Sequence, residues 1–222
     1  MFEIFWSMFP EILSRILKGA IVTIEVTVFS SIGAIMVGLL LVFLHRSKLK
    51  PLSMFAKVYV EIIRGIPAMV ILFIIYFGLP DLGVRLSPVI SAVIGLSMNG
   101  GAYLSEVFRS TIDSVHKGQT EAAMAVGMTP AQNMRYIVLP QAAVIAIPNI
   151  GNYVISLFKD TAIVSTIAAP EIMLASTNLI SQTFVAMPIY LLTAVVYFCM
   201  SYPMSLFVRR LEKRIGKGVQ ST

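Results

Sequence analysis

Five long stretches of this chain contain no Asp, Glu, Lys or Arg, and they limit its fold more than any other feature. They cover residues 26–44, 65–80, 86–105, 136–158 and 172–208. Crossing a bilayer core about 30 Å thick takes about 20 apolar residues in a helix, whereas the alternating strands of an outer-membrane barrel need only about 10. The stretches therefore predict an all-α integral membrane protein.

Composition excludes a soluble domain of this size. Only 13% of the 222 residues are charged and 57% are hydrophobic, whereas soluble domains are about 25% charged. Five membrane helices leave no room for a sizeable domain outside the bilayer, so residues 1–222 are expected to form a single transmembrane domain. The lone cysteine, Cys199, excludes an intrachain disulfide.

Widening the stretches to include isolated polar residues gives about five transmembrane helices. They are predicted at 20–44, 57–79, 87–112, 141–168 and 185–208. Residues 1–18 are expected to form a separate short helix in the membrane interface, because Ile12 and Ile16 share one helical face and Arg15 and Lys18 lie on the other.

The distribution of basic residues predicts the orientation of these helices. Twelve Lys and Arg residues fall in the segments 45–57, 106–136 and 209–222, and three fall on the alternate side. Cytoplasmic loops carry the excess of basic residues, so the N-terminus is expected outside and the C-terminus in the cytoplasm. Small residues at Ser30, Ala34 and Gly38 also predict a face for close helix packing.

The chain contains no motif for chemistry or for an energy source of its own. It has no phosphate-binding loop, no zinc-binding histidine pair and no nucleophile elbow. We therefore predict no catalytic residue and no metal site. Active transport by this chain would take its energy from an ion gradient or from a separate ATPase.

Residues 113–140 form a cytoplasmic loop with strong local signals. A short helix is predicted over 120–126, with Gly127 in the left-handed position that often follows a helix. Thr129 and Gln132 fit a capping box for a second helix that starts at Pro130. The segment is either a well-capped surface loop or a docking element that seats small residues and Glu121 in a partner's groove.

The residues of this loop resemble the EAA loop of ABC importer permeases. The matching residues are Glu121-Ala122-Ala123, Gly127 and Ile137-Val138-Leu139-Pro140, with no gap in their spacing. Further segments resemble the polar amino acid (histidine/glutamine/arginine-type) branch of that family: Ile63-Arg64-Gly65-Ile66-Pro67, Gly101-Ala102-Tyr103-Leu104-Ser105-Glu106, Gly118-Gln119, Pro140-Gln141-Ala142 and Lys159-Asp160-Thr161. The resemblance covers roughly residues 19–210.

The resemblance implies a type I ABC importer-like permease subunit, multi-pass in a bacterial plasma (inner) membrane, and no enzyme. It implies two ATP-binding cassette subunits, a second permease (homodimer or related heterodimer) and a solute-binding protein that delivers a polar amino acid. No cofactor is expected in this chain, because the partner ATPase uses ATP and Mg. The family's coupling role carries over to Glu121, Ala122, Ala123 and Gly127.

Polar groups at membrane depth are costly and mark functional positions. Asn99, Glu106, Asn152, Asp160 and Thr161 could line a substrate path, with the two acids accepting from an ammonium group and the others donating to a carboxylate. Hydrogen bonds between helices would explain the two asparagines almost as well. The carboxylates of Glu106 and Glu61 could also simply form ion pairs with Arg109 and Arg64, each three residues further along the same helix face.

An ion-coupled secondary carrier is the alternative function, with Glu25, Glu106 and Asp160 as coupling sites. Five helices without an internal repeat argue against it, because many carriers are built from two repeated halves.

Overall fold

The computed structural model describes residues 2–219, and they are helical with no strand among them. The longer helices are α1 (Phe2–His45), α2 (Lys50–Gly65), α4 (Pro88–Asp113), α7 (Leu139–Asp160), α8 (Ile172–Thr183) and α9 (Ala186–Val219). Shorter helices are α3 (Ala68–Phe73), α5 (Lys117–Ala125) and α6 (Pro130–Asn133). Two short segments are π-helical, Ile74–Gly78 and Met134–Val138, and two are 3-10 helices, Leu79–Leu82 and Thr161–Ile167.

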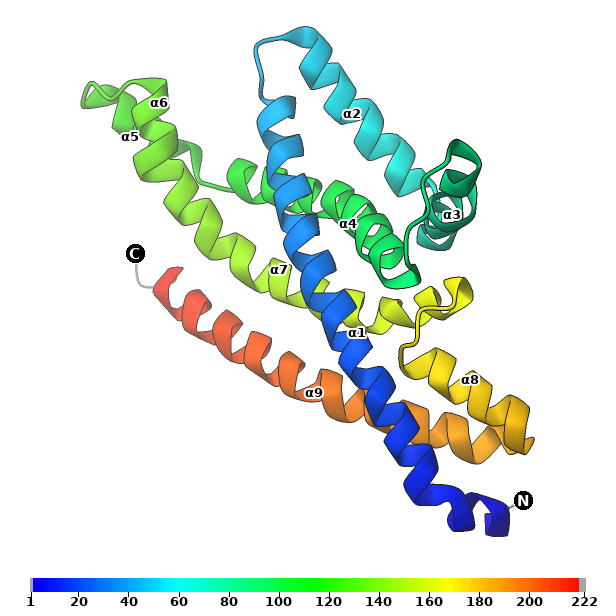
Figure 1. The fold of residues 1–222 in the computed structure, drawn as a ribbon. Helices are drawn as coiled ribbons and strands as arrows, with labels where there is room; N and C mark the ends of the chain where they lie inside the picture. Colours follow the sequence, from blue (N-terminus) through cyan, green and yellow to red (C-terminus); the bar gives the residue numbers. More distant parts are fainter. Residues whose placement is uncertain (1, 220–222) are drawn as a thin grey trace.

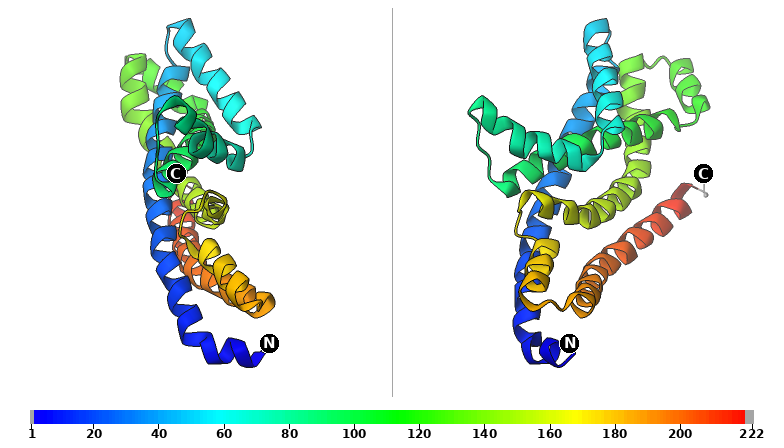
Figure 2. Two further views of the ribbon diagram at one scale, coloured as in Figure 1. Left: turned by 45° about the vertical axis from the view of Figure 1, so that its right-hand side comes forward. Right: turned by 90° about the vertical axis from the view of Figure 1, so that its right-hand side faces the viewer.

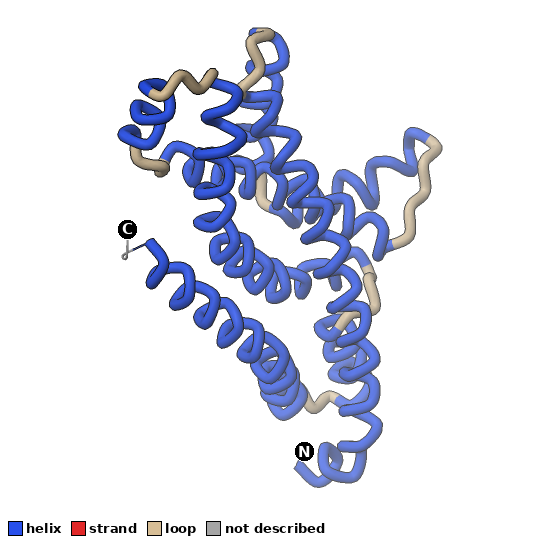
Figure 3. The backbone as a smooth tube through the Cα atoms, turned by 90° about the vertical axis from the view of Figure 1, so that its left-hand side faces the viewer, coloured by secondary structure: helices blue, strands red, loops and turns tan. Residues whose placement is uncertain are grey.

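Helix α1 runs the length of the molecule and crosses α4 (Figure 1). In the right-hand view of Figure 2, α3 lies on one side of α1 and the pair α5 and α6 lies on the other. The N-terminus and the α5–α6 pair lie at opposite ends of the molecule, which is also clear in the tube drawing of Figure 3.

Small residues allow the close crossing of α1 and α4. Ala34 is fully buried, and a Cβ atom on Gly101 would lie 2.3 Å from Val37 Cγ1. A Cβ atom on Gly38 would lie 3.2 Å from the carbonyl oxygen of Gly101. The predicted small-residue face of the first helix is therefore confirmed, and it packs against α4. Gly101 and Gly100 of α4 serve this contact, whereas Gly95 of the same helix lies against Leu72.

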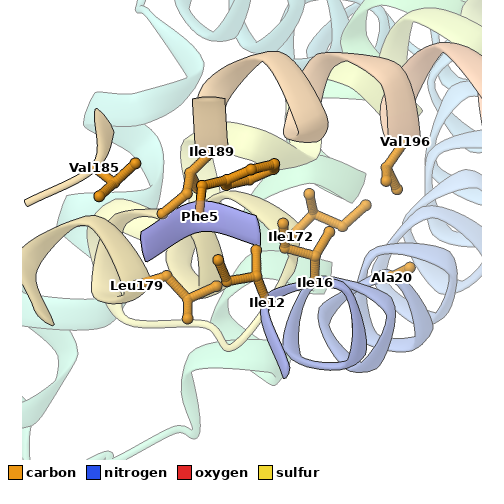
Figure 4. Close-up of a cluster of buried hydrophobic side chains, with 9 residues drawn as sticks. All are labelled: Phe5, Ile12, Ile16, Ala20, Ile172, Leu179, Val185, Ile189 and Val196. Carbon is orange, nitrogen blue, oxygen red and sulfur yellow. The ribbon is translucent and has the colours of Figure 1, made fainter. Parts of the chain in front are cut away.

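The N-terminal segment differs from the separate interfacial helix expected over 1–18. Residues 2–45 form one continuous helix, with Pro10 inside it. Ile12 and Ile16 are almost fully buried in a cluster with residues of α8 and α9 (Figure 4). Protein covers the apolar face that was expected to meet lipid. Gly19 lies inside this helix, and only glycine fits there because a Cβ atom would lie 2.8 Å from the backbone of Glu171.

The helix expected over 57–79 is broken. α2 ends at Gly65, and the chain bends by 103° before the segment Ala68–Leu82. Ile66 is extended (φ −103°, ψ 132°), as a residue before proline prefers, because the ring of Pro67 disfavours the helical conformation there. The bend was missed although Pro67 was a visible signal.

The remaining expected helices lie close to observed ones. α4 covers the prediction over 87–112, and α7 with its terminal 3-10 turn covers residues 139–167 against the predicted 141–168. α9 begins at Ala186, one residue after the predicted start, and continues beyond 208. By length and composition, Phe5–His45, Pro130–Ile167 and Ala186–Ile215 could each cross a membrane, and the bent pair after Lys50 could form a fourth span.

Candidate functional site

The predicted turn at Gly127 closes a short helix at one end of the molecule. α5 runs from Lys117 to Ala125, with the His116 imidazole accepting from the Gly118 N–H (3.1 Å). Gly127 has φ +85°, and its N–H donates to the Met124 carbonyl oxygen (3.0 Å). A Cβ atom on Gly127 would meet no other atom within 4 Å. Glycine is therefore favoured here by backbone conformation and not by crowding.

The capping box is confirmed in the next helix. Thr129 Oγ1 accepts from the Gln132 N–H (3.3 Å), and Gln132 Oε1 accepts from the Thr129 N–H (2.8 Å). Asn133 Nδ2 donates to Thr120 Oγ1 (3.2 Å) and so joins α6 to α5. These bonds fix the two helices relative to each other, and the chain continues through one π-helical segment into α7.

The pair α5 and α6 has an inner and an outer face. Ala123 is buried, and α5 packs against α6 and the π-helical segment Met134–Val138. Glu121 and Ala122 are exposed, as are Met124 (47%) and Val126 (79%). The outer face therefore presents small and apolar side chains and one carboxylate, and α5 is held in place by its buried side.

Glu106 forms an ion pair with its neighbour Arg109. Arg109 Nη2 lies 2.6 Å from Glu106 Oε2, and Arg109 Nη1 lies 3.4 Å from Asp113 Oδ2. Asp113 also pairs with Arg46, which follows α1 (2.8 Å). The neutralisation considered for Glu106 and Arg109 is observed. Among residues 2–219, Glu61 and Arg64 form no ion pair shorter than 4 Å.

The five predicted path residues differ in burial and in hydrogen-bond partners. Asn152 Nδ2 donates to Glu212 Oε1 of α9 (2.9 Å). Thr161 is fully buried, and its hydroxyl donates to the Phe158 carbonyl oxygen (2.7 Å). Asn99 is partly buried in α4, and Asp160 is exposed at the end of α7. In the part of the chain that the structure describes, none of the five bonds to another.

One functional-looking acid was missed by sequence reasoning. Glu171 is fully buried, caps α8 by accepting from the Met173 and Leu174 N–H groups (2.8 and 2.7 Å), and accepts from the Tyr197 hydroxyl of α9 (2.8 Å). Burial raises the pKa of Glu171 above its ordinary value, while these three hydrogen bonds lower it. Its position before an apolar helix was the available signal. Because these donors belong to α8 and α9, Glu171 links the two helices.

No group of three or more His, Cys, Asp or Glu side chains suited to a metal ion occurs within residues 2–219. The candidate site is the exposed α5–α6 pair, which continues through the Met134–Val138 segment into α7.

Sequence comparisons match the chain to known transport proteins over most of its length. Residues 31–217 match the family described as binding-protein-dependent transport system inner membrane component. The chain is 38% identical over 199 residues to the probable amino-acid ABC transporter permease protein YckA of Bacillus subtilis (90% of this chain, 88% of the relative). It is 37% identical to the L-cystine transport system permease protein TcyB of the same organism (96% and 92%). It is 33% identical to the glutamine transport system permease protein GlnP of Escherichia coli (95% and 97%).

Solved structures agree with these sequence matches. A chain of an amino acid ABC transporter crystallised with histidines superposes with a TM-score of 0.91 at 33% identity, covering 95% of this chain and 98% of that one. A chain of the inward-facing MetNI methionine ABC transporter superposes with a TM-score of 0.70 at 19% identity, which shows a shared fold (90% and 98%). These similarities support a permease of an ATP-driven importer and not the secondary carrier. The chain belongs to the family of inner membrane components of binding-protein-dependent transport systems.

Proposed function

We propose that this chain is the permease subunit of an ATP-driven importer that forms the translocation path for polar amino acids. The named relatives include glutamine and cystine permeases and an amino acid transporter crystallised with histidines, which favours this substrate class. The chain has no phosphate-binding loop, so separate ATPase subunits that use ATP and Mg supply the energy.

The α5–α6 pair is the coupling element in this proposal, and its geometry is the observation that carries it. Glu121 and Ala122 are exposed on the outer face, and Ala123 is buried on the opposite face of α5. Gly127 forms the turn after α5 at φ +85°. A helix with little side-chain bulk can seat deeply in a groove of an ATPase, where Glu121 pairs with a basic group. Closure of the ATPases then moves α7 through the short π-helical link.

The assembly contains two ATP-binding cassette subunits, a solute-binding protein and a second permease, which is a copy of this chain or a related one. The excess of basic residues supports an orientation with the α5–α6 pair and the C-terminus in the cytoplasm and the N-terminus outside. The proposal counts five spans, adding the 26-residue α4 to the three helices and the bent pair that are long and apolar enough to cross a membrane. α4, α7 and the 3-10 turn that follows α7 line the path and carry Asn99, Glu106, Asn152, Asp160 and Thr161.

Co-purification of the partner ATPase tests this proposal. The tagged chain extracted in detergent should retain two ATPase subunits for each pair of permeases, and Glu121→Arg should remove most of the ATPase because the reversed charge repels the basic groove. Lys48→Glu, a charge reversal in the neighbouring loop, serves as the control and should retain it. An ATPase that binds Glu121→Arg as well as the unmodified chain would place the coupling contact elsewhere.

A further inference from the structure

The last turns of α9 carry four basic residues beyond the charge-free stretch. Arg209, Arg210, Lys213 and Arg214 follow directly after the stretch 172–208. The helix continues through them without a break and ends at Val219. At 3.6 residues per turn, the four side chains fall within about 140° of the helix circumference. They therefore form one continuous face, which we call the basic stripe.

Two contacts with α7 fix the direction in which the basic stripe faces. A Cβ atom on Gly151 would lie 2.7 Å from Val208 Cγ2. Asn152 Nδ2 donates to Glu212 Oε1 (2.9 Å). Val208 and Glu212 are four residues apart, so they share the side of α9 that the basic stripe leaves free. α9 runs beside α7 (Figures 1 and 3) and turns the basic stripe away from it.

The positive charges of the basic stripe are not neutralised within residues 2–219. All four side chains are exposed, and none of them forms an ion pair of 4 Å or less in this range. Glu212 is the one acid in the sequence 209–215, and it accepts from Asn152 on the other side of the helix. A fixed row of unpaired cations creates a positive potential that attracts an anionic partner.

The position of the basic stripe along α9 matches the headgroup layer of a bilayer. Residues 209–214 extend the helix by about 9 Å beyond its apolar part, and the headgroup region adds about 5–8 Å on each side of the hydrocarbon core. Cations at this depth attract anionic phospholipids of the cytoplasmic leaflet. The ATPase is the competing partner, but its proposed groove is basic because it receives Glu121, and a basic groove repels the stripe.

We propose that the basic stripe binds the phosphate groups of anionic phospholipids in the cytoplasmic leaflet and so holds the C-terminal end of α9 at the membrane surface. The proposal goes beyond the proposed function and rests on it for the orientation of the chain. Each of the three arginines can hold a phosphate with two parallel hydrogen bonds, and the lysine adds a point charge. α7 then moves against a helix whose end the leaflet holds in place.

Photo-crosslinking to a lipid tests the proposal in the complex of permease and ATPase. The complex is reconstituted in phosphatidylcholine vesicles that contain a photoreactive phosphatidylglycerol, and crosslinked peptides are identified by mass spectrometry. We expect crosslinks in the segment 209–215. The double variant Arg210→Gln with Arg214→Gln should lower them at least about tenfold, because each cation near the leaflet contributes about a fivefold preference. Lys48→Gln with Lys50→Gln removes the same charge from another cytoplasmic segment and should change them by less than about twofold.

A neutral probe on the unmodified complex does not depend on the folding of variants. Photoreactive phosphatidylcholine should label the segment 209–215 at least about tenfold less than the anionic probe, and about 0.5 M salt should reduce labelling by the anionic probe. Equal labelling by the two lipids or unchanged labelling in the double arginine variant would overturn the proposal. Labelling that occurs only without the ATPase would also overturn it, because the ATPase would then cover the stripe. Crosslinking requires neither ATP nor substrate, so a complex that binds the lipid but transports no amino acid would contradict the proposed function alone.

Discussion

Gly127 connects local backbone geometry to the proposed coupling contact. Its φ of +85° lies in the left-handed region, where a side chain with a branched Cβ is strained by about 1–2 kcal/mol. The open space around it would accommodate a larger residue. A substitution there therefore acts on the turn between α5 and α6 without crowding its surroundings.

Gly127→Val is expected to uncouple ATP hydrolysis from transport. The turn would relax toward negative φ and tilt α5, so uptake should fall to about a tenth or less while the ATPase still hydrolyses ATP. Uptake and hydrolysis measured in the same reconstituted vesicles check this. Gly78→Val, also in open space but at φ −86°, should leave both rates unchanged. Coupled uptake in Gly127→Val at the normal rate would contradict the role of the turn.

Glu171 is expected to stabilise the joint of α8 and α9. Glu171→Ala removes the acceptor for two N–H groups and for the Tyr197 hydroxyl, which should cost about 1–3 kcal/mol in the free energy of unfolding. Glu171→Gln keeps one acceptor oxygen and should cost less. Thermal unfolding in detergent measures both, with the exposed Asp81→Ala as the control. Equal stability of the Ala variant and the unmodified chain would contradict this role.

Sequence reasoning works at single residues when the interaction is local. The capping box of Thr129 and Gln132 joins residues three apart and could be predicted. Glu171 could not be assigned, because Tyr197 lies 26 residues away and the covering backbone of α1 about 150 residues away. The hydrogen bond between Asn152 and Glu212 could not be predicted either, because the two residues are 60 positions apart.

At the scale of elements, the α1–α4 crossing holds the membrane helices together. Gly101→Ala places a methyl group 2.3 Å from Val37 Cγ1, so the helices must separate. Such overpacking costs about 1–3 kcal/mol, and the unfolding temperature in detergent should fall. Gly78→Ala, with no neighbour within 4 Å, should lower it by much less. Equal unfolding temperatures of the two variants would contradict close packing at this crossing.

The apolar pattern predicted most helices but not how each one ends or bends. Charge-free stretches predicted α4, α7 and α9, because helices that cross a bilayer must be apolar. The bend at Pro67 follows from one residue inside an otherwise apolar stretch, and α8 follows from the cap at Glu171. The continuous α1 depends on contacts with α8 and α9 that no local pattern encodes.

At the scale of the whole molecule, the elements with proposed roles lie toward one end of the fold. The α5–α6 pair lies at the end opposite the N-terminus. The ion pair of Arg46 and Asp113 connects the C-terminal end of α1 to α4. In the proposed orientation, this end of the molecule is on the cytoplasmic side and ATPase motion reaches α7 through the α5–α6 pair.

The source of energy is the most direct test of the central claim that the chain is the permease of an ATP-driven importer. Uptake of labelled amino acid is measured in vesicles that hold the permease, its ATPase and the solute-binding protein. We predict uptake that requires ATP, stops with vanadate and persists with a protonophore. Uptake that follows an ion gradient in vesicles without the ATPase would contradict the account.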